Sequence, residues 1–291
     1  MRVLLTGANG FIGSAFRRAL RRAGHSVRPL VRTAENAEDL VGDLRHCDLQ
    51  AAIAGCQFVV HAASRTAGSG ADLWSENVET TQRVVDAAAA ADAGVLYVST
   101  TGVYGRAAGV FEAPDRMPRL PSSELSRARA VAEDVVLAAG GTVVRPHVVF
   151  GAGDRWVIPP LVEFMRQADA WLGGPDVRVA AVSVARLAST VAELVGRPLP
   201  PVLHAAEIEP VRIADLVRPR FAAARADLPV ATVSVDRAVR MLRGRGVSRN
   251  ALMMVGADSR MVLDPVWRDA LTAPLVSAAQ EAAPNRADQF V

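Results

Sequence analysis

The sequence predicts an α/β fold in which a doubly wound parallel sheet carries a smaller C-terminal lobe. Three observations support this. An apolar strand pattern runs straight into a glycine-rich turn and a helical pattern, strand and helix patterns then alternate, and the alternation loosens beyond Gly151. With 291 residues and 51% hydrophobic content, the chain can bury one large core together with such a lobe.

The first predicted strand covers residues 2–6, and a glycine-rich turn and a helix follow it at once. In such a turn Gly7 permits the tight bend, Gly10 lets the backbone approach a pyrophosphate, and Gly13 lets the helix pack closely on the strand. The free N–H groups at the start of the helix attract phosphate. The stretch therefore predicts a Rossmann-type dinucleotide site, with contacts from Gly7, Asn9, Gly10, Phe11 and Ile12.

The second predicted strand, residues 26–32, carries the feature that selects the cofactor. A carboxylate at its end would bond the ribose hydroxyl of NAD, whereas a nearby arginine accommodates the additional phosphate of NADP. The strand ends in Leu30-Val31-Arg32-Thr33, with an arginine and no acid. The sequence therefore favours NADP(H) over NAD(H), unless Arg32 merely points into solvent.

The remaining elements of the first half follow in regular order. A short third strand or loop closes at Asp43-Leu44, and the small residues Ala62, Ala63 and Ser64 follow a buried strand, where they would let a cofactor lie close. The expected strands are residues 57–62, 95–99 and 142–145, and the expected helices are residues 47–55, 74–91 and 122–139. We expect a Rossmann core at about 1–151, a substrate-binding lobe at 152–279 with some return to the core, and a disordered polar tail at 280–291.

Charge and composition exclude several classes of protein. All 33 basic residues are arginines, the formal net charge is only +3, and the arginines are interleaved with acids, so no basic stripe for nucleic acid is present. No apolar run reaches the length of a membrane span. Cys47 and Cys56 are too few for a disulfide framework, and no His/Cys cluster suggests a metal. We therefore expect a cytoplasmic protein with a small-molecule partner and no metal, nucleic-acid or membrane partner.

Several motifs together resemble the extended short-chain dehydrogenase/reductase family over nearly the whole chain. They are the glycine turn, Gly42-Asp43-Leu44, Val59-Val60-His61-Ala62-Ala63, Asn77-Val78-Glu79-Thr80-Thr81, Ser99-Thr100-Thr101-Gly102-Val103-Tyr104-Gly105, and Arg145-Pro146 with Phe150-Gly151. The resemblance implies that Asp43 contacts adenine, that Pro146 flanks the nicotinamide and that Thr100 is the catalytic hydroxyl. Because the family often dimerises through two helices, here about 74–91 and 122–139, a monomer or a homodimer is expected.

The sequence departs from the family at its Tyr-x-x-x-Lys motif. Glu133 matches the glutamate that follows the motif, which places Leu125 at the tyrosine position and Arg129 at the lysine position. The chain has no lysine, and its only tyrosines are Tyr97 and Tyr104, so no shift of the alignment restores the motif. Leucine cannot donate a proton and arginine cannot release one, although Arg129 can still hold the nicotinamide ribose by hydrogen bonds.

The proton donor is therefore open. The candidates are Thr100 or Ser99 relaying from water, Tyr104, His147, and the substrate itself, and we favour a self-activating phenolic ketone oriented by Thr100. A neutral histidine bonded to a neighbouring loop is the plainer expectation for His147. We place Tyr104, Leu125 and Trp156 at the substrate, although core packing explains Trp156 as well as stacking on an aromatic ring does.

Three functions follow from these expectations. The first is an NADPH-dependent ketoreductase that acts on a polycyclic aromatic ketone in antibiotic or other secondary-metabolite biosynthesis. The second is a nucleotide-sugar epimerase, dehydratase or 4-ketoreductase, which the missing tyrosine weakens because epimerases and dehydratases cycle protons at the sugar. The third is a non-enzymatic NADP-binding sensor, which would have no need of the hydroxyls at residues 99–101.

Overall fold

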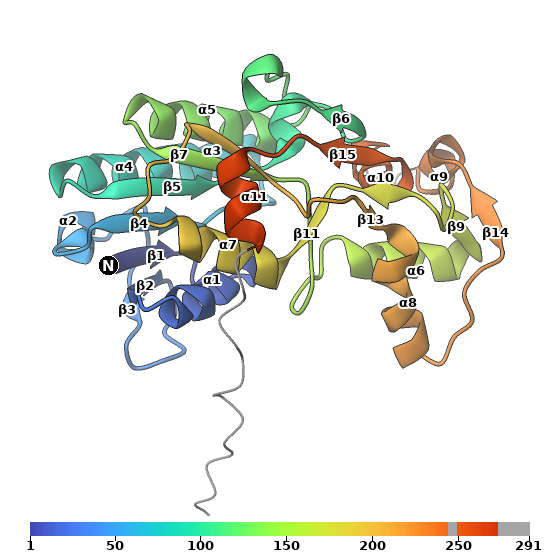
Figure 1. Ribbon diagram of the computed structural model, residues 1–291, viewed down its shortest axis with the longest axis horizontal. Coiled ribbons are helices and arrows are strands. Elements are labelled where there is room, and N and C mark those ends of the chain that lie inside the picture. Colours follow the sequence, from blue (N-terminus) through green and yellow to red (C-terminus); the bar gives the residue numbers. More distant parts are fainter. Residues whose placement is uncertain (244–248, 273–291) are drawn as a thin grey trace, which may run out of the picture.

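A seven-stranded parallel sheet, on the left in Figure 1, forms the core of the larger part of the molecule in the computed structural model, which describes residues 1–243 and 249–272. The strand order is β12-β7-β5-β4-β1-β2-β3, and every neighbouring pair is parallel. The strands are β1 (Arg2–Thr6), β2 (Ser26–Val31), β3 (Leu40–Val41), β4 (Phe58–His61), β5 (Gly94–Val98), β7 (Thr142–Pro146) and β12 (Val202–Ala205). The predicted doubly wound α/β fold is confirmed.

Helices cover both faces of the sheet because successive side chains of each strand point to opposite sides. Val3 and Leu5 of β1 belong to one buried cluster, and Leu4 between them belongs to another. The first cluster is completed by α1 (Phe11–Arg22), α7 (Val184–Leu194) and α11 (Pro265–Thr272). The second is completed by α2 (Leu49–Ile53), α4 (Thr80–Ala90) and α5 (Glu124–Ala138).

The segment between β4 and β5 differs from the single helix expected at 74–91. It comprises α3 (Gly70–Trp74), a π-helical turn η1 (Ser75–Glu79) and α4. The helix begins early because Ser69 and Asp72 form a reciprocal capping box. The π turn coincides with Asn77, whose buried side chain bonds the loop after β4 instead of facing solvent.

Strand register brings the chemically important loops to one edge. Thr6, the last residue of β1, pairs with Leu30 of β2 and with His61 of β4. Because the three strands are parallel and end together, the glycine turn, the segment at Arg32 and the loop from Ala62 meet at the carboxyl edge. In open α/β sheets ligands bind at this edge.

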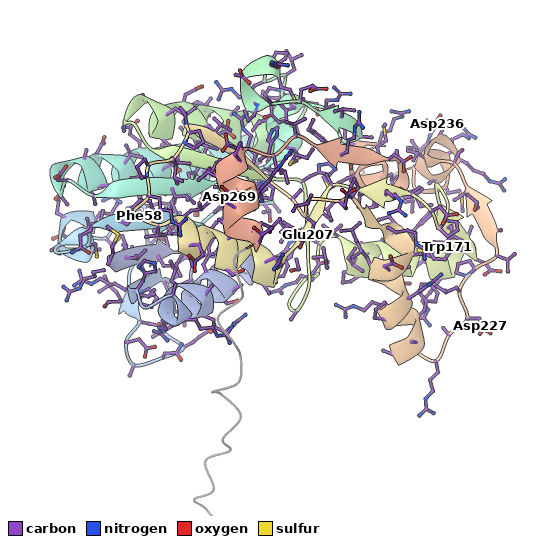
Figure 2. The ribbon with its side chains drawn as sticks, viewed as in Figure 1. Phe58, Trp171, Glu207, Asp227, Asp236 and Asp269 are labelled. Carbon is purple, nitrogen blue, oxygen red and sulfur yellow. The ribbon has the colours of Figure 1, made fainter. Side chains whose placement is uncertain are left out.

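The C-terminal part of the chain builds a further hydrophobic cluster beside the sheet, separate from the two on its faces and to the right in Figure 1. Its core includes Trp171, which lies among the helices and strands of this part in Figure 2 and whose indole N–H donates to the Pro229 carbonyl at 2.7 Å. Its helices are α6 (Ile158–Ala168), α8 (Ile213–Ala223), α9 (Val235–Met241) and α10 (Arg249–Gly256).

Short strands outside the main sheet occur in pairs. They are β8 (Val148–Phe150) with β11 (Ala181–Ser183), β9 (Ala170–Leu172) with β14 (Ala231–Val233), β10 (Arg178–Val179) with β13 (Val211–Arg212), and β6 (Gly109–Phe111) with β15 (Ser259–Met261). Two 3-10 turns, η2 (Thr101–Tyr104) and η3 (Pro114–Arg116), lie between β5 and α5.

The tail expected at 280–291, and residues 273–279 of the expected lobe, lie outside the described residues. Within residues 1–243 and 249–272, no helix combines the length and apolar character that crossing a bilayer requires.

Candidate active site

A cavity of about 620 Å³ opens at the carboxyl edge of β1, β2, β3 and β4. This volume falls within the usual range for cofactor sites, about 300–1,000 Å³. Its lining includes nine of the residues that the sequence assigns to the cofactor: Gly7, Asn9, Gly10, Arg32, Asp43, Leu44, Ala62, Ala63 and Ser64. Phe11 and Ile12 begin α1 beside it.

The glycine turn is so tightly packed that Gly7 and Gly13 cannot carry a side chain. Gly7 has a φ of +69°, and a Cβ there would lie 2.7 Å from the Ala63 nitrogen. A Cβ at Gly13 would lie 2.0 Å from the Gly7 carbonyl oxygen. No side chain caps the start of α1, so its first N–H groups remain available to an anion. The turn therefore fits the pyrophosphate of a dinucleotide.

Arg32 lies at the end of β2, on the cavity wall, and is exposed. Among residues 1–243 and 249–272, no carboxylate pairs with its guanidinium. The loop after β2 is held against α1, because Arg17 of that helix pairs with Asp39 at 2.6 Å and Asp39 accepts from the Glu35 nitrogen at 2.8 Å. A free arginine on a fixed wall can bind the extra phosphate of NADP.

Asn77 organises the opposite wall. Its Oδ1 accepts from the Ser64 hydroxyl at 2.7 Å and from the Arg65 nitrogen at 3.1 Å, and its Nδ2 donates to the Leu73 carbonyl at 2.8 Å. Arg129 of α5 donates from Nη2 to Ser64 Oγ at 3.0 Å. Its Nε is buried and has no partner among the described residues. The guanidinium thus reaches the cavity wall through Ser64, a residue that lines the cavity.

Thr100 and Ser99 follow β5 at the same edge of the sheet. Thr100 Oγ1 accepts from the Gly102 nitrogen at 3.1 Å, so the hydroxyl proton remains free to donate to a ligand. Ser99 is buried, and its hydroxyl has no partner in the part of the chain that the structure describes. Leu125 is half-buried in the first turn of α5, four residues before Arg129 on the same helix face. The residue that the sequence analysis assigns to the tyrosine position is thus apolar.

His147 follows β7 and is buried. Its Nδ1 is hydrogen-bonded to Thr101 Oγ1 at 2.7 Å, and its ring contacts Phe111 at 4.8 Å between centroids. Burial lowers the pKa of His147 to about 4. At neutral pH the ring therefore carries no acidic proton to give, which favours the plainer interpretation of this histidine. Pro146, its neighbour, ends β7 at the same edge.

Tyr104 belongs to a buried polar network. Its oxygen accepts from Arg145 Nη1 at 2.7 Å, and its O–H donates to His204 Nε2 at 2.6 Å, since His204 Nδ1 lies 3.0 Å from the Val262 carbonyl. Arg145 in turn forms a two-point ion pair with Glu133, at 3.0 and 2.5 Å. Burial raises the pKa of Tyr104. The hydroxyl is thus committed to the protein interior.

Trp156 stands at the start of the lobe, half exposed. Its ring lies 5.7 Å from the ring of Phe11, and the Arg155 guanidinium lies 5.1 Å from its centroid. Asp154, two residues before Trp156, is buried and accepts from the backbone nitrogens of residues 156, 157 and 158, which fixes the loop. The indole is therefore held beside the glycine turn, where it can contact a ligand.

Sequence reasoning did not assign roles to Asn77, Arg65, Glu76, Arg145 or His204, all of which shape the site or its support. Asn77 and Arg145 stand in motifs that resemble the family, and this resemblance was the one feature of the sequence that could have indicated a role for them. His204 lies 100 residues from Tyr104, and nothing in the local pattern links the two. No group of three or more side chains in the described ranges could hold a metal ion.

Two curated relatives are named as reductases of ketones. A 4-hydroxy-2-methyl-3-oxo-4-farnesyl-3,4-dihydroquinoline-1-oxide ketoreductase of Stigmatella aurantiaca is 33% identical over 196 residues, which cover 60% of this chain and 58% of the relative. A 2-alkyl-3-oxoalkanoate reductase of Stenotrophomonas maltophilia (strain K279a) is 32% identical over 195 residues, with the same two shares. The matches thus span less than two thirds of each relative.

Solved structures share the fold at low identity. A UDP-glucuronic acid 4-epimerase from Bacillus cereus in complex with NAD has a TM-score of 0.66 at 16% identity, covering 88% of this chain and 97% of that one. A dTDP-4-dehydrorhamnose reductase from Clostridium acetobutylicum has a TM-score of 0.69 at 17% identity, covering 93% and 97%.

The family itself is identified by a match that covers most of the sheet. The family model described as the NAD dependent epimerase/dehydratase family matches residues 3–179. Together with the reductase relatives, this match supports an enzyme that uses a nicotinamide cofactor. The chain belongs to the NAD dependent epimerase/dehydratase family.

Proposed function

We propose that the protein is an NADPH-dependent ketoreductase that works without the usual tyrosine acid. One arrangement at the carboxyl edge of the sheet carries the proposal. The cavity there has an unpaired Arg32 on its wall, the hydroxyls of residues 99–101 follow β5, the strand beside β4, and Leu125 stands at the position that the sequence assigns to the tyrosine. Arg32 favours NADPH over NADH, and the hydroxyls provide a group that can orient a ketone. Leu125 in place of tyrosine removes the ordinary proton donor.

The substrate that we propose is a polycyclic aromatic ketone of polyketide type, reduced in the biosynthesis of an antibiotic or another secondary metabolite. The relative from Stigmatella aurantiaca supports a ring ketone, because its name describes an oxo-dihydroquinoline substrate. The absence of lysine and the lost tyrosine resemble the angucyclinone ketoreductase of simocyclinone biosynthesis. The ketone would lie between the core, residues 1–151, and the lobe that we place at 152–279, with Trp156 against its rings.

Bound NADPH would supply the hydride. The chain's own contribution is to orient the ketone and to exclude water. Thr100 uses a lone pair to accept from Gly102, so its O–H donates to the carbonyl oxygen. A ketone beside a phenol carries an internal donor that can protonate the oxygen. A general acid contributes about 10²–10⁴-fold, whereas holding the reactants together lowers the barrier by up to about 7–11 kcal/mol. Reduction without the tyrosine is therefore energetically reasonable.

The test is NADPH oxidation, followed at the nicotinamide absorbance band, with polycyclic quinone ketones and nucleotide-sugar ketones as substrates and NADH in parallel. We expect turnover of aromatic ketones and a preference for NADPH that Arg32→Ala abolishes while leaving NADH turnover unchanged. Turnover of nucleotide sugars alone would favour the epimerase-type function instead. Cofactor binding without any turnover would identify a sensor and refute the proposal.

A further inference from the structure

A chain of four charged side chains lies along the outer end of the cofactor cavity. Arg45 pairs with Asp43 at 2.6 Å, and Glu76 Oε1 lies 3.5 Å from Arg45 Nη1 and also 3.5 Å from Arg65 Nη1. Glu76 is thus the single anion shared by two guanidinium groups. Removing its charge would leave the two guanidinium groups without their common partner.

The chain joins the two walls of the cavity. Asp43 and Arg45 follow β3 on one wall, Arg65 follows β4 on the other, and Glu76 comes from the π turn η1. Asp43, Arg65 and Glu76 all line the cavity. Arg65 is also tied to its own loop, because its Nε donates to the Ala67 carbonyl at 2.8 Å. An ionic bridge therefore spans the gap between two separate loops.

The position of this bridge along the cavity follows from the fixed points of a dinucleotide site. The pyrophosphate belongs at the start of α1, and the adenosine ribose belongs at the end of β2 beside Arg32. The adenine, one unit further out, then lies between the segment 42–44 and the segment 65–67, both of which line the cavity. The bridge spans this end of the cavity and no other.

We propose that Arg45, Glu76 and Arg65 form an ionic clasp that retains the adenosine end of the bound cofactor, with Glu76 as the positioning residue. The inference rests on the proposed cofactor binding and adds to it a device for retention. Glu76 is largely shielded, with 17% of its side chain exposed, whereas both arginines are 40% exposed. Ion pairs this open to solvent are individually weak and are screened by salt. The clasp can therefore open to release cofactor, and its strength controls dissociation without touching the hydride step.

The experiment measures the dissociation rate of NADPH from the full chain by stopped-flow fluorescence, in the wild type, in Glu76→Gln and in Glu79→Gln. Glu79 is an exposed carboxylate on the same π turn, and it provides the matched control for charge. Glu76→Gln is expected to raise the dissociation rate about three- to tenfold, and Glu79→Gln to leave it unchanged. Arg45→Gln, which removes one arm only, should give an intermediate rate.

Two further readouts separate a clasp from a general loss of structure. The affinity for 2′,5′-ADP, which carries only the adenosine end, should fall by the same factor as that for NADPH, while that for nicotinamide mononucleotide should not change. Raising salt from about 0.05 to about 1 M should bring the ratio of the Glu76→Gln rate to the wild-type rate toward one. Glu76→Asp should restore part of the retention.

The outcomes distinguish the two proposals. A wild type that binds neither NADPH nor NADH would refute the proposed function. A wild type that binds NADPH, with a dissociation rate that Glu76→Gln and Arg45→Gln leave unchanged, would refute the clasp alone. An equal increase in Glu76→Gln and Glu79→Gln would also refute it, because it would reflect the net charge of the surface.

Discussion

The two tyrosines of the chain offer a direct test of what the Tyr104 hydroxyl does. Tyr104→Phe removes one oxygen that accepts from Arg145 at 2.7 Å and donates to His204 at 2.6 Å, in a site where Tyr104 is 3% exposed. Each buried group left without its partner costs about 1–3 kcal/mol, so the loss of both partners should lower the unfolding free energy of the variant by about 2–6 kcal/mol. For a chain of this size that corresponds to a fall in Tm of about 5 °C or more.

Tyr97→Phe is the control, because the buried Tyr97 hydroxyl has no partner among the described residues. We expect Tyr97→Phe to be neutral or stabilising in the same urea and thermal unfolding measurements. Because the Tyr104 hydroxyl is committed to the interior, Tyr104→Phe should change ketone turnover less than about tenfold, well below the hundredfold at which the contribution of a general acid begins. A loss of a hundredfold or more with intact NADPH binding would show that Tyr104 donates the proton, and would refute this assignment.

Three further predictions concern pH and the reacting groups. Burial lowers the pKa of three histidines to about 4, so the folded state favours their neutral form. Their contribution to stability is complete above about pH 6.5 and is lost as the pH falls toward about 4, by about 1.4 kcal/mol per pH unit for each group. The three residues are His61, His147 and His204. A urea concentration at the unfolding midpoint that does not change between pH 6.5 and about 4 would contradict this prediction. Thr100→Ala should cost about tenfold in turnover or less if the hydroxyl only orients the ketone, and near-complete loss would make it the proton relay. Leu125→Tyr combined with Arg129→Lys should raise turnover by less than about a hundredfold if the substrate protonates itself; a larger gain would show that an external acid was missing.

The sheet and its cofactor edge could be predicted from the sequence because local signals specify them. The strand at residues 2–6 and the glycine turn form a contiguous pattern, and β1 and α1 follow it closely. The π turn at Asn77 could not be predicted, because it depends on bonds to Ser64 and Arg65 from another segment. The earlier start of that helix carried a readable signal in Ser69 and Asp72, a capping box.

The buried hydrogen bonds that hold the site in place were harder to predict than the residues that line the cavity. Tyr104 stands in a motif that places it near the substrate, yet its hydroxyl is committed to Arg145 and His204. His204 reaches that position only because β12 returns to pair with β7 at the edge of the sheet. The predicted roles of Ser99, Thr100 and Leu125 toward a ketone remain predictions.

The first strand and the last described helix share one core, and this has a consequence for synthesis on the ribosome. Trp267 of α11 is fully buried in the cluster that contains Val3 and Leu5, and its indole N–H donates to the Ala206 carbonyl at 3.1 Å. Although α1 and α7 cover part of this apolar face of the nascent sheet, the part on which α11 packs stays uncovered until residue 272 has left the exit tunnel. Partly made chains expose the kind of surface that chaperones bind and that aggregates. A ribosome that stalls between α7 and α11 should consequently hold a chain that recruits chaperones, although most of its cofactor edge has already been translated.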